Sequence, residues 1–489
     1  MAYIDIPQEI SSKEVCENGY ILSSNAYKKL LMKNTHFKTL RELLARDLKR
    51  SDLGVEVGSL SYVPKSPFTF MRAKALQEHS FLPEITDESL LCILPQSFVN
   101  MDLKKGNVII SKDSNIGEVV ILEKDYPNTM LSGAMYKLPL TQHKYYILSV
   151  IKHTIFREQL DFIVPKGATI RHAKQLFLDC KIPFPNHNTQ QTIAFIEMLT
   201  QSIITKEKLI KERHAKILNF IESELLNNQK PNTFKYAYPT FQEIQKSGRL
   251  DTGIYCEEFK KLDFLIKNYK NDVFYIDKKK IKSGSTPKMR FIGQENFSRY
   301  QWLTPSHCSD YGTIKEIERI NFIGKPNLTQ DCILLINRGQ GYDCGKSIFY
   351  SFVDSKQGQH NQGMYRIFDY PEPQMLFMLC FLNAKFMRTY CSYLSLGSKM
   401  KELKIEHFLQ IPFPNFPQNL QEQIALLYHN PSAKLDYENL NLENFKIQDE
   451  TFCENAGIYE LDKSIKYLKN ILNSCIDDIA NDREVVIGF

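Results

Sequence analysis

The sequence predicts an α+β protein in which two tandem, pseudo-repeated domains, both mixed and rich in strands, are separated by long antiparallel coiled-coil helices. Three observations predict this fold class: an internal repeat, short β-branched runs followed by glycine turns in each copy, and isoleucines spaced by seven between the copies. A chain of 489 residues is also too long for one compact core, so at least two domains are expected.

The internal repeat covers most of the chain. Ile182–Asn186 recurs as Ile411–Asn415, and Met135–Lys137 recurs as Met364–Arg366, both at an offset of 229 residues. Further pairs keep the same order with shifts of one or two residues: Gly167 and Gly397, Lys174 and Lys404, Asn188 and Asn419, Gln190 and Gln421, Ile193 and Ile424, Ala194 and Ala425. Because this period is far above the roughly 20–50 residues of solenoid repeats, each copy is expected to be a domain.

Each copy contains a predicted buried strand and then a predicted helix. Asn107–Ser111 and Cys332–Ile336 are β-branched runs followed by glycine-containing turns. Asn188 can cap a helix that continues to about Asn228. Its seam residues are spaced strictly by seven: Ile196, Ile203, Ile210 and Ile217. Its charged residues are predicted on the other faces: Lys206, Glu207, Lys208, Lys211, Glu212 and Arg213.

The C-terminal segment is the predicted partner of this helix, because its apolar residues alternate by three and four: Ile465, Leu468, Leu472, Cys475 and Ile479. The alternative is an ordinary core-facing helix. Residues 429–461 interrupt the second copy and have no counterpart in the first. The predicted divisions are a first domain (1–187), a spacer helix (188–230), a linker (231–247), a second domain (248–417) and a C-terminal region with the second spacer helix (418–489).

Charge and cysteine content restrict the class of protein. The net charge is +6, but residues 241–410 hold 25 basic and 18 acidic residues, whereas residues 411–489 hold 6 and 13. This asymmetry predicts a polyanion partner for the first segment and a different partner for the second. Eleven cysteines without a Cys-x-x-Cys pair predict buried free thiols. The sequence has neither a long apolar run nor an export signal, so a cytoplasmic protein without membrane contact is expected.

The sequence shows no enzymatic motif. It lacks a phosphate loop, His-Glu-x-x-His, Gly-x-Ser-x-Gly, and the Asn/Asp-Pro-Pro-Tyr/Phe tetrapeptide of amino-methyltransferases. Asp331-Cys332 and Asn337-Arg338-Gly339 are interpreted as strand-end turn residues, and His214 as a solvated helix position. We therefore expect no catalytic residue, no metal and no cofactor.

Basic residues interleaved with aromatic ones in residues 278–302 form the predicted nucleic-acid interface. Lys and Arg bind phosphates, while Arg, Lys, Asn and Gln also read base edges. The alternative is a solvated charged face, but two similar domains joined by long helices favour a bipartite DNA site. The candidates are Lys278, Lys279, Lys280, Lys282, Thr286, Lys288, Arg290, Gln294, Asn296, Arg299 and Arg338 in the second copy, and Lys65, Arg72 and Lys112 in the first.

Together these motifs resemble the specificity subunit of type I restriction-modification systems over nearly the whole chain. Lys282–Pro287 resembles the family's Ser-Gly-Gly-Thr-Pro signature near the start of a recognition domain, and Arg249–Asp251 with Tyr255 is similar to the Arg-x-Asp segment before it. The passage into the spacer helix also resembles the family, at Gly167–Ile170, Ile182–Pro185, Gln190 and Ile193. The first copy lacks a clear Gly-x-Thr-Pro, and its nearest candidate is Gly58–Pro64.

The resemblance implies that each copy is a target-recognition domain that reads one half of a split, asymmetric DNA sequence. The paired spacer helices, with Ile196, Ile203, Ile210, Ile217, Ile465, Leu468, Leu472 and Ile479 in their seam, would fix the unread gap. Two modification subunits would supply the adenine methyltransferase site, and a restriction subunit would supply translocation and cleavage. The alternatives are a DNA-recognition subunit of another phage-defence methylation system, a coiled-coil adaptor, or an enzyme without standard motifs.

Overall fold

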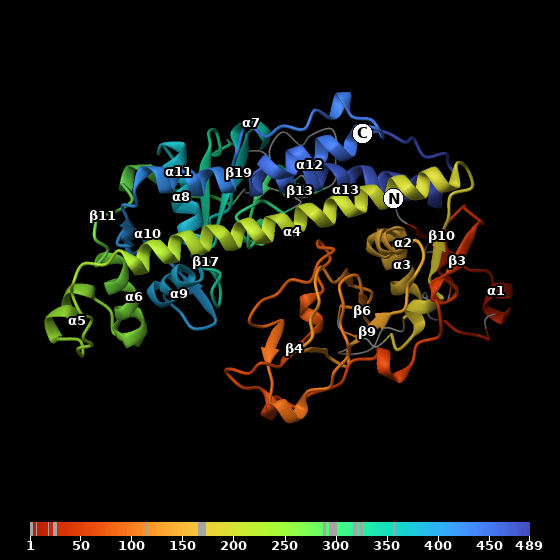
Figure 1. Cartoon of the computed structure of the whole chain (residues 1–489), viewed down its shortest axis with the longest axis horizontal. Helices are drawn as coiled ribbons and strands as arrows, with labels where there is room; N and C mark the ends of the chain where they lie inside the picture. Colours follow the sequence, from red (N-terminus) through yellow and green to blue (C-terminus); the bar gives the residue numbers. More distant parts are fainter. Residues whose placement is uncertain are drawn as a thin grey trace. The chain divides into compact units, whose positions relative to one another are not determined.

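The computed structural model describes the chain except for residues 1, 2, 6, 18, 23–26, 114, 165–172, 287–289, 293–300, 316–319, 323–325 and 356, and gives the backbone alone for residues 162, 290–292 and 320–322. Helices and strands are mixed, which confirms the predicted fold class (Figure 1). The chain forms two compact units. Unit 1 contains Met1–Lys208, Leu435–Cys453 and Lys463–Phe489, and unit 2 contains Leu209–Lys434 and Glu454–Asp462.

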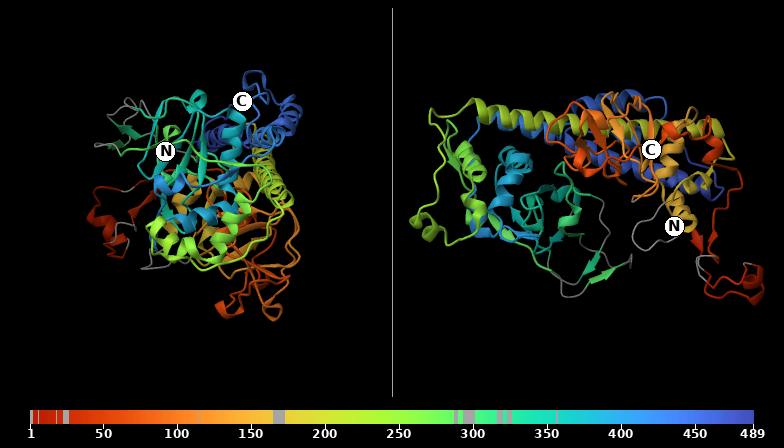
Figure 2. Two further views of the ribbon diagram at one scale, coloured as in Figure 1. Left: turned by 90° about the vertical axis from the view of Figure 1, so that its left-hand side faces the viewer. Right: turned by 90° about the horizontal axis from the view of Figure 1, so that it is seen from below.

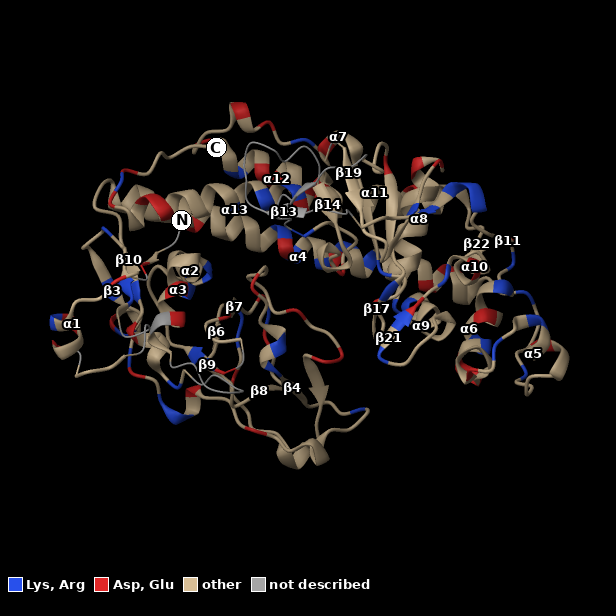
Figure 3. Cartoon of the chain, turned by 180° about the vertical axis from the view of Figure 1, so that it is seen from behind, with Lys and Arg blue, Asp and Glu red and all other residues tan. Residues whose placement is uncertain are grey.

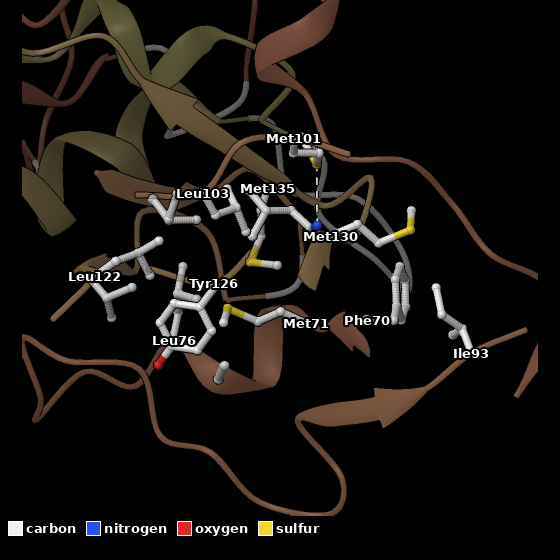
Figure 4. Close-up of a cluster of buried hydrophobic side chains, with 14 residues drawn as sticks. Phe70, Met71, Leu76, Ile93, Met101, Leu103, Leu122, Tyr126, Met130 and Met135 are labelled. Atoms are coloured by element: carbon white, nitrogen blue, oxygen red, sulfur yellow. Dashed lines mark hydrogen bonds between the residues drawn. The ribbon is translucent and has the colours of Figure 1, made fainter. Parts of the chain in front are cut away.

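The described part of unit 1 contains two three-stranded sheets, besides the strand pairs β1-β2 and β10-β3. The first has the antiparallel order β7-β6-β9, and the second has the order β5-β4-β8, in which β4 and β8 are parallel. Its elements are β1 (Ile4–Asp5), α1 (Ser12–Glu17), β2 (Lys29–Leu30), β3 (Phe37–Thr39), β4 (Thr69–Met71), β5 (Leu90–Cys92), β6 (Val108–Ser111), β7 (Val119–Ile121), β8 (Thr129–Leu131), β9 (Met135–Leu138), α2 (Lys144–Lys152), α3 (Thr154–Ile163) and β10 (Lys181–Pro183). One apolar cluster of its core contains Met71, Met101, Met130 and Met135 (Figure 4).

Unit 2 repeats this plan with a four-stranded antiparallel sheet of order β12-β20-β16-β18. Figure 2 shows its β13–β15 pair projecting from the rest of the unit. Its elements are α5 (Phe241–Ser247), α6 (Glu257–Lys267), β11 (Val273–Phe274), β12 (Ile281–Ser283), β13 (Arg290–Ile292), β14 (Gln301–Leu303), β15 (Ile320–Phe322), β16 (Cys332–Ile336), β17 (Arg338–Gln340), β18 (Ser347–Tyr350), α7 (Phe352–Ser355), β19 (Gly358–His360), β20 (Met364–Ile367), α8 (Glu372–Asn383), α9 (Lys385–Leu394), β21 (Met400–Glu402), α10 (Ile405–Phe408), β22 (Phe413–Pro414) and α11 (Gln418–Tyr428).

A glycine at the turn between the first two sheet strands shows how closely the copies agree. Gly117 donates its N–H to the Ser111 carbonyl at 2.9 Å, and Gly345 donates to the Ile336 carbonyl at 2.9 Å. Both have positive φ, +82° and +91°. A Cβ on Gly117 would lie 2.2 Å from the Leu160 side chain, and one on Gly345 would lie 2.6 Å from Cys391 Sγ. Only glycine tolerates this backbone so close to the following helix.

The repeated Met-Tyr strings occupy the same register in both sheets. Met135 pairs with Ser111, and Met364 pairs with Ile336, which is the last residue of the equivalent strand. The neighbouring tyrosine packs on a phenylalanine in each copy: the Tyr136 and Phe177 ring centroids are 5.9 Å apart, and those of Tyr365 and Phe408 are 6.3 Å apart. The repeat in the sequence is therefore a repeat of structure.

Helix α4 (Thr189–Asn227) begins in unit 1 and ends in unit 2, close to the predicted bounds of 188–230. In unit 1, α13 (Ile458–Ala480) lies antiparallel to it (Figure 1), because Asn186 before α4 donates to Asp482 after α13 at 2.6 Å, and Glu207 pairs with Lys469 at 3.2 Å. All eight predicted seam residues are at most 6% exposed: Ile196, Ile203, Ile210, Ile217, Ile465, Leu468, Leu472 and Ile479.

Two charged residues of α4 that are predicted on the faces away from the apolar seam are buried. Lys206 is 0% exposed and pairs with Asp449, to which Ser202 Oγ also donates at 2.7 Å. Glu207 is 7% exposed. Asp449 belongs to α12 (Phe445–Asn455), so the segment 429–461, predicted as an interruption, contributes a helix that packs on α4.

Segments from the two ends of the sequence meet in unit 1. The Lys33 and Asn34 N–H groups both donate to the Ala480 carbonyl at 3.1 Å, and Asn34 Nδ2 donates to the Ile479 carbonyl at 2.8 Å. These donors satisfy carbonyls at the end of α13 that have no partner within the helix. Residues before the first domain's sheets thus cap the helix that follows the second domain.

The sequence predicts buried free cysteines and no membrane contact. All eleven cysteines are free thiols, as predicted, and eight of them are buried. The exceptions are Cys16, which is exposed, and Cys92 and Cys256, which are half-buried. Of the helices in the described ranges, none is long and apolar enough to cross a membrane.

Candidate nucleic-acid interface

Residues 282–286 are the described part of the signature segment of the second copy, and Pro287 lies outside the described residues. This part is bonded to β20 and to the end of β19 in unit 2. Ser283 pairs with Tyr365 of β20, Gly284 N donates to the Met364 carbonyl at 3.2 Å, and Ser285 N donates to the His360 carbonyl at 3.0 Å. A Cβ on Gly284 would lie 2.2 Å from the Asn361 carbonyl oxygen. The segment needs glycine here because two backbones approach more closely than any side chain allows.

The first copy has the same arrangement at Gly54, four residues before the predicted position. Gly54 N donates to the Met135 carbonyl at 3.0 Å, and Val55 N donates to the Leu131 carbonyl at 2.9 Å. A Cβ on Gly54 would lie 2.0 Å from the Ser132 carbonyl oxygen. Gly58–Pro64, the nearest candidate in the sequence, does not make this contact at its glycine, because none of the described atoms lies within 4 Å of a Cβ on Gly58.

Cations stack on aromatic rings beside the signature segment in unit 2. Lys280 Nζ lies 4.4 Å from the centroid of the Tyr370 ring, and Lys282 Nζ lies 5.5 Å from that of Phe368. The guanidinium carbon of Arg366 lies 4.6 Å from the same Phe368 ring. In each pair the charged group itself lies over the ring face. Lys282 is exposed, while Lys280 and Arg366 are half-buried. Arg366 was not among the predicted residues, although the repeated Met-Tyr-Lys/Arg string contains it.

Polar residues that the sequence analysis missed lie directly beneath the segment. His360 Nδ1 is 2.8 Å from Asn327 Oδ1, and Gln359 Nε2 donates to the Ser285 hydroxyl at 2.7 Å. Burial, and next the charge of Arg366, lowers the pKa of His360 to about 4. Strand alternation in β19 gave no signal for them, because Gln359 and His360 are both buried.

The remaining predicted residues of the second copy are not one cluster. Lys278 and Lys279 are exposed on a single turn before β12, and Thr286 is exposed at the end of the signature segment. Arg338 starts β17 and pairs with Glu402 of β21 at 3.0 Å, in the basic surroundings of β17 and β21 that Figure 3 shows. Four predicted residues lie outside the described part of the chain, Lys288, Gln294, Asn296 and Arg299, and only the backbone of Arg290 is described, in β13.

The candidates of the first copy are separate in unit 1. Lys65 is exposed, Arg72 donates to the Glu88 carbonyl at 3.3 Å, and Lys112 pairs with Asp113. No hydrogen bond or ion pair between described residues joins these three to one another. Their role in binding stays a prediction.

The Arg-x-Asp segment anchors the entry to the second domain. Arg249 is 8% exposed, donates Nε to Asp251 Oδ1 at 2.7 Å, and donates Nη1 to the Leu394 carbonyl at 2.7 Å. Its hydrogen bond lowers the pKa of the Asp251 carboxyl despite partial burial. This segment therefore positions the domain against the end of α9.

Two further predictions concern histidine and metal. His214 is not a solvated position, which corrects the sequence interpretation: its ring packs edge-on against Tyr311 with centroids 5.2 Å apart. Burial lowers its pKa, and Asp310 opposes this effect. Among the described residues, no group of three or more His, Cys, Asp or Glu side chains is placed to hold a metal ion.

Comparison with solved structures finds similar chains. A type I restriction-modification system S subunit from M. genitalium is 13% identical, with 91% of this chain and 95% of that chain covered and a TM-score of 0.41. A structure of the type I R-M system is 11% identical, with 92% and 98% covered and a TM-score of 0.28. The HsdS subunit from Thermoanaerobacter tengcongensis is 12% identical, with 91% and 96% covered and a TM-score of 0.27.

Two other comparisons find nothing. No family model matches the chain, and no curated protein matches it. At the identities and TM-scores given above, the likenesses to solved structures extend along the chain but do not assign its function.

Proposed function

We propose that this chain is the DNA sequence-specificity subunit of a type I restriction-modification complex. It recognises a bipartite, asymmetric site on double-stranded DNA, with one half read by each domain. The observation that carries the proposal is the duplication of the glycine-centred entry contact, at Gly54 in unit 1 and Gly284 in unit 2, within a chain whose motifs resemble that family.

In such a complex this chain selects the DNA sequence, and the partner subunits carry out the chemistry. Two modification subunits dock on the helical regions and supply methyl transfer, and a restriction subunit supplies cleavage. The acidic residues 411–489 and the helices α4 and α13 offer surface for these partners, while the basic residues 241–410 suit DNA phosphates. The helix α4 of 39 residues, about 60 Å at 1.5 Å per residue, serves as the ruler between half-sites.

Binding of the purified full-length chain to a library of randomised duplex DNA tests this function. We expect enrichment of two short sequences separated by a fixed unread gap. We also expect affinity to fall steeply with salt, because each neutralised phosphate releases a counterion. A chain that enriches no sequence at any salt concentration would be an adaptor, and the proposal would be wrong.

A second measurement separates this role from an enzymatic one. The purified chain alone is incubated with DNA, Mg²⁺ and S-adenosylmethionine, and both strand cleavage and methyl transfer are measured. We expect neither, because the proposal leaves chemistry to the partner subunits. Adjacent methyltransferase and helicase-nuclease genes would distinguish a type I system from another phage-defence methylation system.

A further inference from the structure

The two copies differ at three positions next to the entry segment, the stretch that begins at Gly54 in unit 1 and at Gly284 in unit 2. In unit 1, Met101, Met130 and Leu131 belong to an apolar cluster against which Val55 packs, and Figure 4 shows Met101 and Met130 within it. In unit 2 the equivalent positions hold three polar residues, Asn327, Gln359 and His360, which we name the polar cluster.

Backbone hydrogen bonds establish that these positions are equivalent. Leu131 N donates to Met101 Sδ at 3.3 Å, and His360 N donates to Asn327 Oδ1 at 3.0 Å. One strand further on, Lys137 Nζ donates to the Met101 carbonyl at 3.0 Å, and Arg366 Nη1 donates to the Asn327 carbonyl. The same framework therefore carries an apolar set in one copy and a polar set in the other.

Stability does not account for the polar set. Gln359 is 4% exposed and His360 is 1% exposed, and burying polar side chains costs free energy unless every group is bonded. Gln359 Oε1 and Arg366 Nε are buried and have no hydrogen-bond partner among the residues that the structure describes. Unit 1 shows that the framework is compatible with methionine and leucine instead. Buried polar groups without hydrogen-bond partners, which lower stability, occur mostly at functional sites.

The side chain of Gln359 bonds the entry segment directly, whereas Asn327 Oδ1 bonds the backbone and the ring of His360. Gln359 Nε2 donates to the Ser285 carbonyl at 3.1 Å and to the Ser285 hydroxyl at 2.7 Å. In unit 1, Val55 replaces Ser285, and the side chain of Met130 has no N–H to donate. Side-chain hydrogen bonds thus orient the stretch at Ser285 in unit 2, whereas apolar packing holds the equivalent stretch at Val55 in unit 1.

We propose that Gln359, supported by Asn327 and His360, is a positioning residue that fixes the Ser285–Thr286 stretch and so determines the base preference of the second half-site alone. This inference rests on the proposed function, because it names residues that set one half of the recognised DNA sequence. Gln359 acts through Ser285 and does not itself touch DNA, since it is buried.

The test uses Gln359→Met, which installs the residue of the first copy, and Ser285→Ala, which removes the bonded hydroxyl from an exposed position. Met130→Leu in unit 1 is the matched control. Each full-length chain is used to select binding sequences from randomised duplex DNA. A further chain, in which residues 248–410 are replaced by the second domain of another family member, identifies the half-site that this domain reads. We expect both variants to lose roughly tenfold in discrimination there, about 1.4 kcal/mol, and to keep the first half-site. Met130→Leu changes neither.

Trp302, the only tryptophan, lies opposite Gln359 in the β14–β19 pair, so its fluorescence reports whether unit 2 of each variant is folded. Folded variants with unchanged preference at both half-sites would overturn the proposal. So would equal losses at both half-sites, which indicate a merely structural role. If Gln359→Met does not fold, Ser285→Ala decides. If the wild-type chain itself enriches no bipartite sequence, the proposed function fails first.

Discussion

At the scale of single residues, burial decides which groups respond to pH. His360 is 1% exposed, and its pKa is lowered to about 4 by burial and by Arg366. A histidine in the unfolded chain titrates near about 6.5. Between these two pH values the unfolded state binds a proton that the folded state does not, so stability is full above pH 6.5 and falls as the pH falls toward 4.

We therefore predict that His360→Leu, which installs the residue of the first copy, flattens the acid dependence of unit 2. The wild-type chain should lose up to about 3 kcal/mol of unfolding free energy between about pH 6.5 and 4 from this group. Denaturant unfolding followed by Trp302 fluorescence measures it. His187, exposed in unit 1, provides the control variant His187→Leu, which should keep the wild-type profile. Equal acid sensitivity of all three chains would contradict the prediction.

At the scale of elements, one loop of the first domain is bound to two helices of unit 1. Glu207 of α4 accepts from Phe81 N at 2.8 Å and from Ser80 Oγ at 3.2 Å. Lys469 of α13 pairs with Glu207 and donates to the His79 carbonyl. The loop at residues 79–81 therefore fixes the domain to the helix pair, and Glu207 contacts both sides.

We predict that Glu207→Ala destabilises unit 1 by about 2 kcal/mol, because it leaves the buried Phe81 N–H without its acceptor and removes the carboxylate partner of Lys469, which keeps the His79 carbonyl. Hydrogen exchange of the Phe81 amide should become faster than in the wild type. Glu222→Ala, at an exposed position on the same helix, is the matched control. Unchanged exchange at Phe81 in the Glu207 variant would show that the loop is held by other contacts.

At the scale of the whole molecule, the duplicated architecture predicts independent specificities. Replacing residues 248–410 by the second domain of another family member should change one half-site and leave the other and the gap unchanged. Methylation mapping of a host that carries the exchanged chain with its partner subunits measures this outcome. A change in both half-sites would show that the domains do not read DNA independently.

Much of this architecture was predictable because its signals are local in sequence. β-branched runs placed β6 and β16 within one residue of their observed bounds, and heptad spacing identified α4. The equivalence of Gly54 and Gly284 was not predictable, because it depends on backbone contacts to distant strands while the flanking residues differ. The burial of Lys206 and the polar cluster likewise depend on tertiary partners that no local pattern reveals.

The composition of unit 1 has a consequence for how the protein is made. Its C-terminal segments, Leu435–Cys453 and Lys463–Phe489, are translated only after residues 209–434 of unit 2, so the nascent first domain leaves the ribosome before the end of α13 that residues 33 and 34 cap. At about 5–20 residues per second this delay lasts on the order of tens of seconds. During that interval the isoleucine face of α4 is available to chaperones, and unit 2 can complete its core first.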